Sequence, residues 1–158
     1  MIEKRIENDS FFLKEKQSIE LIQPASPFLW ELDVEIEKGG VFEGRLFGDQ
    51  ETGLRVGIDC EKNSIYVQRD RAEVDFSKEY VCTCQAPLSG DRSSFHLKLL
   101  CDHSSVELFV GDGEISMTNL YLPADDYEAK LKVEAVRGTV EVKQSSVFEM
   151  TSVWRQNS

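Results

Sequence analysis

The sequence predicts an all-β protein, built as a sandwich of two antiparallel sheets. Short runs of alternating apolar and polar residues follow one another along its 158 residues, and a period of two is typical of half-buried strands. Gly, Pro, Asn, Asp and Ser separate these runs at the spacing of about 8–12 residues that is typical of sandwiches. Nowhere does a period of 3.6 persist for the length of a helix. The length suits one domain with a substantial core.

The clearest strands lie between residues 95 and 123. Residues 95–101 and 106–110 alternate between apolar and mostly polar positions, and Asp-His-Ser-Ser between them favours a turn. The dipeptide Asp112-Gly113 is a strong hairpin signal, because both central residues of a type I′ turn have positive φ. We therefore predict a three-stranded antiparallel meander with this turn between its second and third strands.

The remaining chain divides at two prolines, Pro24 and Pro27. Residues 1–27 read either as an N-terminal connection or as a first strand, and residues 28–158 read as the sandwich domain. From Phe28 to Ile36 the alternation is strict, with an acidic outer face, so a half-buried strand is expected there. Further strands are expected at 41–47, 54–58, 65–67, 80–84, 129–135 and 140–142, with a last run at 145–154.

Composition excludes several classes of partner. The net charge of −11 argues against nucleic acid and against an anionic membrane, because phosphate binding depends on clustered Lys and Arg. No apolar run approaches the ~20 residues that span a bilayer, and residues 1–17 lack the apolar core of a signal peptide. The chain as given is expected to be cytoplasmic, or to be a piece of a longer protein.

The four cysteines, Cys60, Cys82, Cys84 and Cys101, lie within strand-like runs. Cys82 and Cys84 would share one face of a strand and behave as small core residues. A Cys-x-Cys pair without a second Cys or His pair is a poor zinc signature. We therefore expect reduced, buried thiols and no metal.

Three segments resemble the C-terminal β-sandwich of glycoside hydrolase family 32, the family of invertases, levanases, inulinases and sucrose-6-phosphate hydrolases. Residues 65–71 resemble its apolar-aromatic-Val-Asp-Arg segment, and residues 148–154 are similar to its Tyr-Glu-Met-Lys-Ser-Ile-Trp ending. His103 stands where Arg is common, and Gly111 where Asn is common. The matching positions of the meander are Asp102, Ser104, Ser105, Val106, Glu107, Phe109, Val110, Gly113, Glu114, Thr118, Tyr121 and Pro123.

The resemblance implies a concanavalin-like jelly roll that serves as the ancillary domain of a β-fructosidase. Family members hydrolyse fructosides with an upstream five-bladed propeller, whose motifs are Trp-Met-Asn-Asp-Pro-Asn-Gly, Arg-Asp-Pro and Glu-Cys. This chain contains none of them, since Arg69-Asp70-Arg71 lacks the proline and Asp59-Cys60-Glu61 has the wrong order. The expected partners are that propeller, a fructan or sucrose-type carbohydrate, and further copies in a homo-oligomer.

Candidate catalytic residues are weak. A retaining glycosidase needs two carboxylates about 5–5.5 Å apart, and Asp112 with Glu114 is the most tempting pair, although solvated loop carboxylates explain them better. Neither His96 nor His103 forms a triad with Ser104, because no Gly-x-Ser-x-Gly elbow surrounds it. A calcium site from Asp91, Asp102 and Asp112 is an alternative whose spacing fits no compact loop motif. We predict no catalytic residue, cofactor or metal ligand.

The two tryptophans are the candidate contacts with sugar or with another domain. Trp30 shares a strand face with Phe28, Leu32 and Val34, so a place in the core explains it better, whereas Trp154 could seal the core or an interface. If the tryptophans formed a stacking platform, the chain would instead be an independent carbohydrate-binding, lectin-like module. The apolar breaks in polar strand faces at Leu29, Phe109 and Trp154 are where contact with a catalytic propeller is expected.

Overall fold

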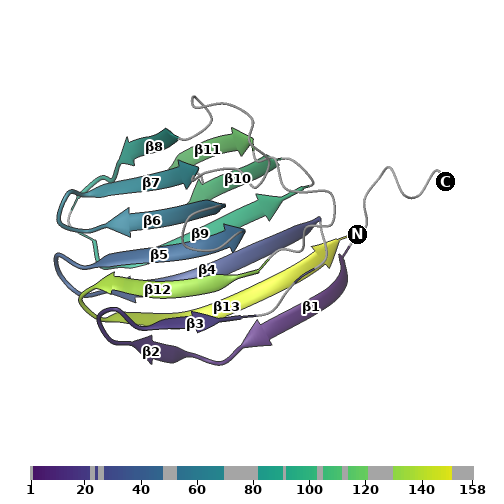
Figure 1. Cartoon of the computed structure of the whole chain (residues 1–158), viewed down its shortest axis with the longest axis horizontal. Helices are drawn as coiled ribbons and strands as arrows, with labels where there is room; N and C mark the ends of the chain where they lie inside the picture. Colours follow the sequence, from purple (N-terminus) through teal and green to yellow (C-terminus); the bar gives the residue numbers. More distant parts are fainter. Residues whose placement is uncertain are drawn as a thin grey trace.

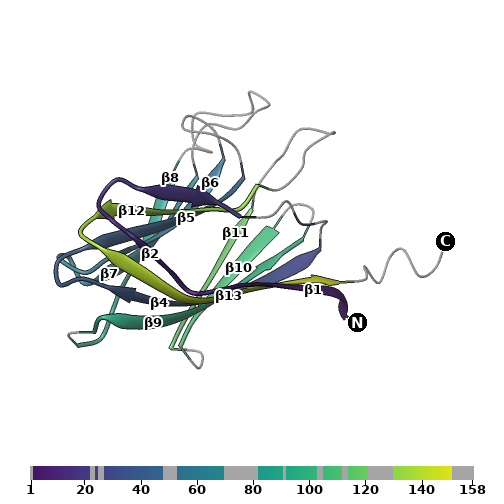
Figure 2. The same cartoon turned by 90° about the horizontal axis from the view of Figure 1, so that it is seen from below.

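The computed structural model describes residues 2–21, 24, 27–47, 53–69, 82–90, 92–102, 105–111, 114–120 and 130–150. Over these residues the chain forms thirteen strands and no helix, arranged as two sheets that lie face to face (Figures 1 and 2). All strand pairs are antiparallel. The predicted two-sheet sandwich is confirmed. Within the described residues, no helix is long and apolar enough to cross a membrane.

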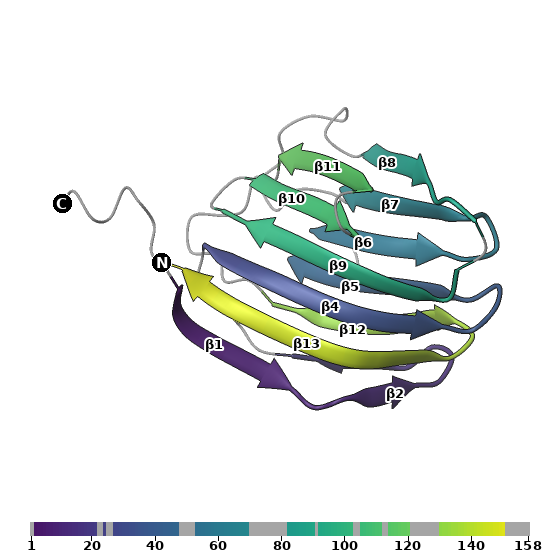
Figure 3. The ribbon, with the colours of Figure 1, turned by 180° about the vertical axis from the view of Figure 1, so that it is seen from behind.

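One sheet has seven strands and is seen from its outer side in Figure 3. Its order is β1-β13-β4-β9-β10-β11, and β2 also pairs with β13. The strands are β1 (Ile2–Asn8), β2 (Phe11–Leu13), β4 (Phe28–Ile36), β9 (Ser94–Cys101), β10 (Ser105–Val110), β11 (Ile115–Leu120) and β13 (Val140–Met150).

The other sheet has six strands in the order β3-β12-β5-β6-β7-β8. They are β3 (Ser18–Glu20), β5 (Val41–Phe47), β6 (Leu54–Asp59), β7 (Ser64–Arg69), β8 (Cys82–Pro87) and β12 (Lys132–Arg137).

The core lies between the sheets and is built by the alternation read from the sequence. In β4 every second residue, from Phe28 to Ile36, is buried, and the residues between are half-buried on the outer face. Trp30 is fully buried, and its ring approaches Gly44 of the opposite sheet, where an added Cβ would lie 3.4 Å from the indole. Its Nε1 donates a hydrogen bond to Ser145 Oγ at 3.0 Å, so the one polar atom of the indole is satisfied inside the core.

The predicted meander is confirmed as β9, β10 and β11, but its second turn is longer than the predicted two-residue type. The last pair of β10 and β11 is Val110 with Ile115, which leaves four residues in the turn, and Glu114 N donates to Val110 O at 3.1 Å. Among the described turn residues, Gly111 has positive φ (63°). Asp112 and Gly113 lie outside the described residues.

Residues 2–20 belong to the sandwich and wrap around one of its sides. β1 and β2 pair with β13 in the seven-stranded sheet, whereas β3 pairs with β12 in the six-stranded sheet. Residues 14–17 cross from one sheet to the other, through a turn in which Lys16 has positive φ (68°). Three strands therefore lie within residues 1–27, and the division of the chain at residue 28 stays a prediction.

The run expected at 140–142 and the described part of the last run form one long strand, β13. A bulge between Val142 and Gln144 shifts its register against β4. An extra residue at this point brings Ser145 opposite Leu32, with its side chain buried beside Trp30.

Candidate functional site

The carboxylate pair considered from the sequence is Asp112 with Glu114, and the structure describes one of the two. Glu114 forms an ion pair with Arg92, with Nη2–Oε2 at 3.0 Å and Nη1–Oε1 at 3.1 Å, and Asp112 lies outside the described residues. Within the described part of the chain, no group of three His, Cys, Asp or Glu side chains could hold a metal. Of the calcium candidates, Asp102 is exposed, and Asp91 and Asp112 are not described.

Of the two candidate tryptophans, the structure describes Trp30. Trp30 is 0% exposed, so its indole has no free face with which to stack on a sugar, in agreement with its interpretation as a core residue. Trp154 lies outside the described residues, and its contact with sugar or another domain stays a prediction.

The described thiols are structural. Cys60, Cys84 and Cys101 are free thiols, as predicted. Cys101 is fully buried, whereas Cys60 and Cys84 are half-buried, so among these three the predicted burial holds for Cys101. Burial raises the pKa of the Cys101 thiol, and burial together with the Asp59 carboxylate raises the pKa of Cys60. A raised pKa makes a thiol less reactive, so neither is placed for nucleophilic chemistry. The side chain of Cys82 is not described.

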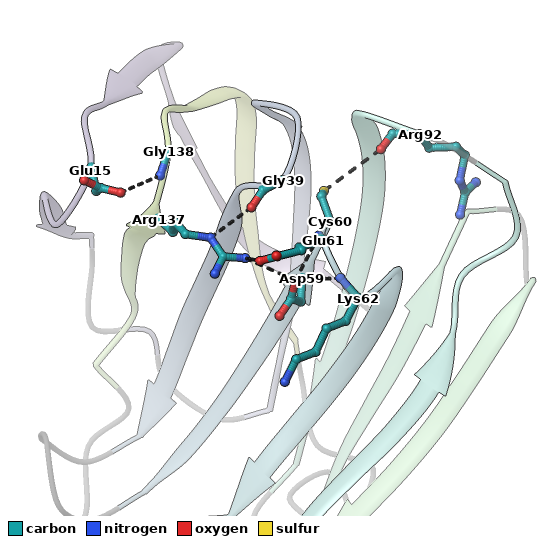
Figure 4. Close-up of polar contacts among 9 residues, drawn as sticks. All are labelled: Glu15, Gly39, Asp59, Cys60, Glu61, Lys62, Arg92, Arg137 and Gly138. Atoms are coloured by element: carbon teal, nitrogen blue, oxygen red, sulfur yellow. Dashed lines mark hydrogen bonds and ion pairs between the residues drawn. The ribbon is translucent and has the colours of Figure 1, made fainter.

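A cluster of polar contacts ties together the turns at one end of the sandwich (Figure 4). Arg137 donates from Nε to Gly39 O at 3.0 Å and contacts Glu61 Oε2 from Nη2 at 2.7 Å. Asp59 Oδ1 accepts hydrogen bonds from the backbone N–H of Glu61 and Lys62, at 2.9 and 3.0 Å. The acidic side chains drawn here therefore serve as turn caps and ion-pair partners, which is a structural role.

A second polar cluster lies on the outer face of the six-stranded sheet. Glu43, Gly57 and Tyr66 are neighbours across β5, β6 and β7, and the Tyr66 ring covers Gly57 so closely that a Cβ there would lie 2.0 Å from Cζ. The Tyr66 hydroxyl donates to the Glu43 carboxylate, and Arg55 Nη1 lies 3.0 Å from Glu43 Oε2. Each polar group of this cluster has a partner within it.

Burial and mutual contacts shift the pKa values of Glu43 and Tyr66 in this cluster. Burial raises the pKa of Glu43, and the Arg55 guanidinium and the Tyr66 hydrogen bond oppose that change. Burial and the Glu43 charge raise the pKa of Tyr66. Sequence reasoning missed the cluster, although Gly57 inside a strand pattern signals close approach by another group.

The outer face of the seven-stranded sheet carries an apolar row, formed by Phe148, Leu29 and Leu100. These residues are direct cross-strand neighbours on β13, β4 and β9, and all three are half-buried. Arg5 lies opposite Phe148 on β1, with its guanidinium carbon 5.3 Å from the ring centroid. The predicted break at Leu29 is part of this row.

The same face becomes polar farther along the strands. His96 Nδ1 lies 2.6 Å from Asp33 Oδ1, and Lys143 Nζ lies 2.7 Å from Glu35 Oε2. Phe109, the second predicted break, is the cross-strand partner of Lys98, which lies two residues before Leu100 along β9. The outer face thus has an apolar end and a charged end.

Comparison with known proteins identifies the family. The family model described as "Glycosyl hydrolases family 32 C terminal" matches residues 4–154. Among curated proteins, the chain is 31% identical over 106 residues to the levanbiose-producing levanase of Bacillus subtilis (66% of this chain, 20% of that protein). It is 29% identical over 101 residues to the extracellular exo-inulinase of Aspergillus awamori (63% of this chain, 19% of that protein).

Solved structures share the fold. The exo-inulinase structure from Aspergillus awamori superposes with a TM-score of 0.77 at 23% identity, covering 97% of this chain and 30% of that one. The fructofuranosidase of Schwanniomyces occidentalis, complexed with fructose, gives 0.74 at 18% identity, covering 96% and 34%. This chain therefore spans about a fifth of the length of these curated relatives, and it belongs to glycosyl hydrolase family 32, as the C-terminal domain of that family.

Proposed function

We propose that this chain is the ancillary C-terminal domain of a β-fructosidase-type glycoside hydrolase. Its role is to pack against a catalytic propeller domain in the same protein and to stabilise it, without carrying out catalysis itself. The observation that carries the proposal is the family match over residues 4–154, in a chain that spans only about a fifth of the curated relatives. In such a protein the catalytic domain occupies the remaining length.

The substrate of the whole protein follows from the same comparison. The relatives are named levanase and exo-inulinase, so a fructan or a sucrose-type carbohydrate is the proposed substrate class. The chemistry belongs to the catalytic domain. Here, Glu114 forms an ion pair with Arg92, and Asp59 of the turn cluster accepts hydrogen bonds from backbone N–H groups.

The rival function, an independent lectin-like module, has less support. A sugar platform needs an exposed aromatic face, and Trp30 has none. The family match also favours the ancillary role. Assembly into a homo-oligomer remains a separate proposal for the whole protein.

The test compares the whole enzyme with a version that ends before this domain. Reading the gene upstream for a Trp-Met-Asn-Asp-Pro-Asn-Gly motif identifies the enzyme to be produced. We expect the truncated enzyme to lose fructoside hydrolysis at a lower temperature than the whole enzyme, because the apolar surface between domains becomes exposed. Equal thermal inactivation of the two forms would contradict the proposal.

A further inference from the structure

We infer that the apolar row of Phe148, Leu29 and Leu100, on the outer face of the seven-stranded sheet, is the surface against which the catalytic domain packs. This inference rests on the proposed function and locates its contact surface. The domain that packs against the row is the one that precedes this domain in the same protein.

Three large apolar side chains face outward at one end of this sheet. Phe148, Leu29 and Leu100 point away from the core, since they alternate with Val147, Trp30 and Leu99, which are buried. An outward row of three large apolar residues on three adjacent strands is unusual on a sheet face in contact with water, where polar residues normally alternate with the core residues.

Charged and aromatic side chains surround the row. Arg5 stands at one end, above the Phe148 ring, and Glu107 stands opposite Leu100 at the other end. Lys98 and Phe109 are paired in the adjacent row. An apolar centre with aromatic and Arg side chains, surrounded by charged groups, is the composition of a protein–protein interface.

The first strand begins at the same end of this face. Ile2 of β1 pairs with Met150 of β13, two residues beyond Phe148 along that strand. The N-terminus thus leaves the sandwich at the apolar end of this face (Figure 3). A domain that precedes β1 is delivered to this end, and the charged end around His96 and Lys143 lies farther along the strands.

Two other surfaces are less suited to contact with the catalytic domain. The outer face of the six-stranded sheet carries polar pairs, including Glu43 with Arg55 and Gln68 with Thr83. Phe12 is 72% exposed, but it is paired with Glu141 at the charged end of the seven-stranded sheet. Neither surface combines apolar neighbours with the place where the chain enters.

The experiment places a charge in the row in the whole enzyme. Leu29→Lys and Leu100→Lys are compared with Ser94→Lys, an exposed position on the same face at the charged end, and with Gln85→Lys on the other sheet. We expect each row variant to be inactivated by heat at least about tenfold faster than the unaltered enzyme, the scale of losing a central apolar contact. The two control variants should match the unaltered enzyme. Limited proteolysis between the domains should accelerate in the same two row variants.

The same substitutions in the isolated 158-residue chain show whether they disturb its folding. If its own urea midpoint falls in a row variant, Leu29→Ser and Leu100→Ser replace the lysine variants. Row variants that behave like the controls, in an enzyme that does lose stability on truncation, would overturn this inference and leave the proposed function intact. If truncation leaves the thermal inactivation of the enzyme unchanged, both this inference and the proposed function would be overturned.

Discussion

At the scale of single residues, the Tyr66 ring covers Gly57 closely. An added Cβ at Gly57 would lie 2.0 Å from Tyr66 Cζ and 2.3 Å from its hydroxyl oxygen, so the ring must move. Gly57→Ala is therefore expected to destabilise the chain by about 1–3 kcal/mol, measured by urea denaturation. In a Tyr66→Ala background the same substitution should cost much less, because nothing then covers the glycine. Equal costs in the two backgrounds would show that the ring does not restrict this position.

Glu43 gives this cluster a predicted pH dependence. Its pKa is raised above the ordinary value of 4.5 in the folded chain, so the folded state holds a proton that the unfolded state has released. Stability is therefore greatest below pH 4.5 for this group and falls as the pH rises toward the raised pKa. Glu43→Gln should remove this fall when the free energy of unfolding is measured from about pH 4 to 8.

A matched variant tests the role of the tyrosine. The Tyr66 hydroxyl hydrogen bond lowers the Glu43 pKa, so Tyr66→Phe should raise that pKa further and carry the fall in stability to higher pH. A pH profile that Glu43→Gln leaves unchanged would assign the dependence to other groups.

At the scale of elements, the turn between β10 and β11 depends on Gly111. Its φ of 63° lies in the left-handed region, where a β-branched residue is strained. Gly111→Val is expected to cost about 1–3 kcal/mol, and Gly111→Asn should cost less, because Asn tolerates this region. Denaturation midpoints of the two variants provide the comparison, and a Val variant as stable as the Asn variant would contradict the turn geometry.

Elements that depend on local pattern were predictable. The alternation of β4 and the order of β9, β10 and β11 follow from neighbouring residues and turn chemistry. Pairings between distant segments were not: β1 joins β13 across most of the chain, and no local signal encodes that register. The row of Phe148, Leu29 and Leu100 could be predicted only in part for the same reason. Leu29 interrupts the polar side of the alternation in β4, which the sequence shows, but its neighbours Phe148 and Leu100 are known only once the order of the strands is known.

At the scale of the whole molecule, this sequence contains none of the three propeller motifs named above. We expect this chain alone to release no fructose from sucrose, inulin or levan. Release is measured as reducing sugar against a control without protein, and Glu114→Gln should leave that background unchanged, because Glu114 is the partner of Arg92. Turnover that disappears with Asp112→Asn or Glu114→Gln would instead make the hairpin tip a catalytic site.

The sheet order also sets when the domain can form during synthesis. β13 pairs with β1, β2 and β4, so it supplies the partner for three strands that leave the ribosome much earlier. Until residues 140–150 have emerged, β1 and β2 have no strand to join in this sheet, and one edge of β4 is open. A nascent chain at that stage exposes an unpaired strand edge, which promotes aggregation. In a protein of this family the catalytic domain would therefore be made well before its C-terminal neighbour is able to fold.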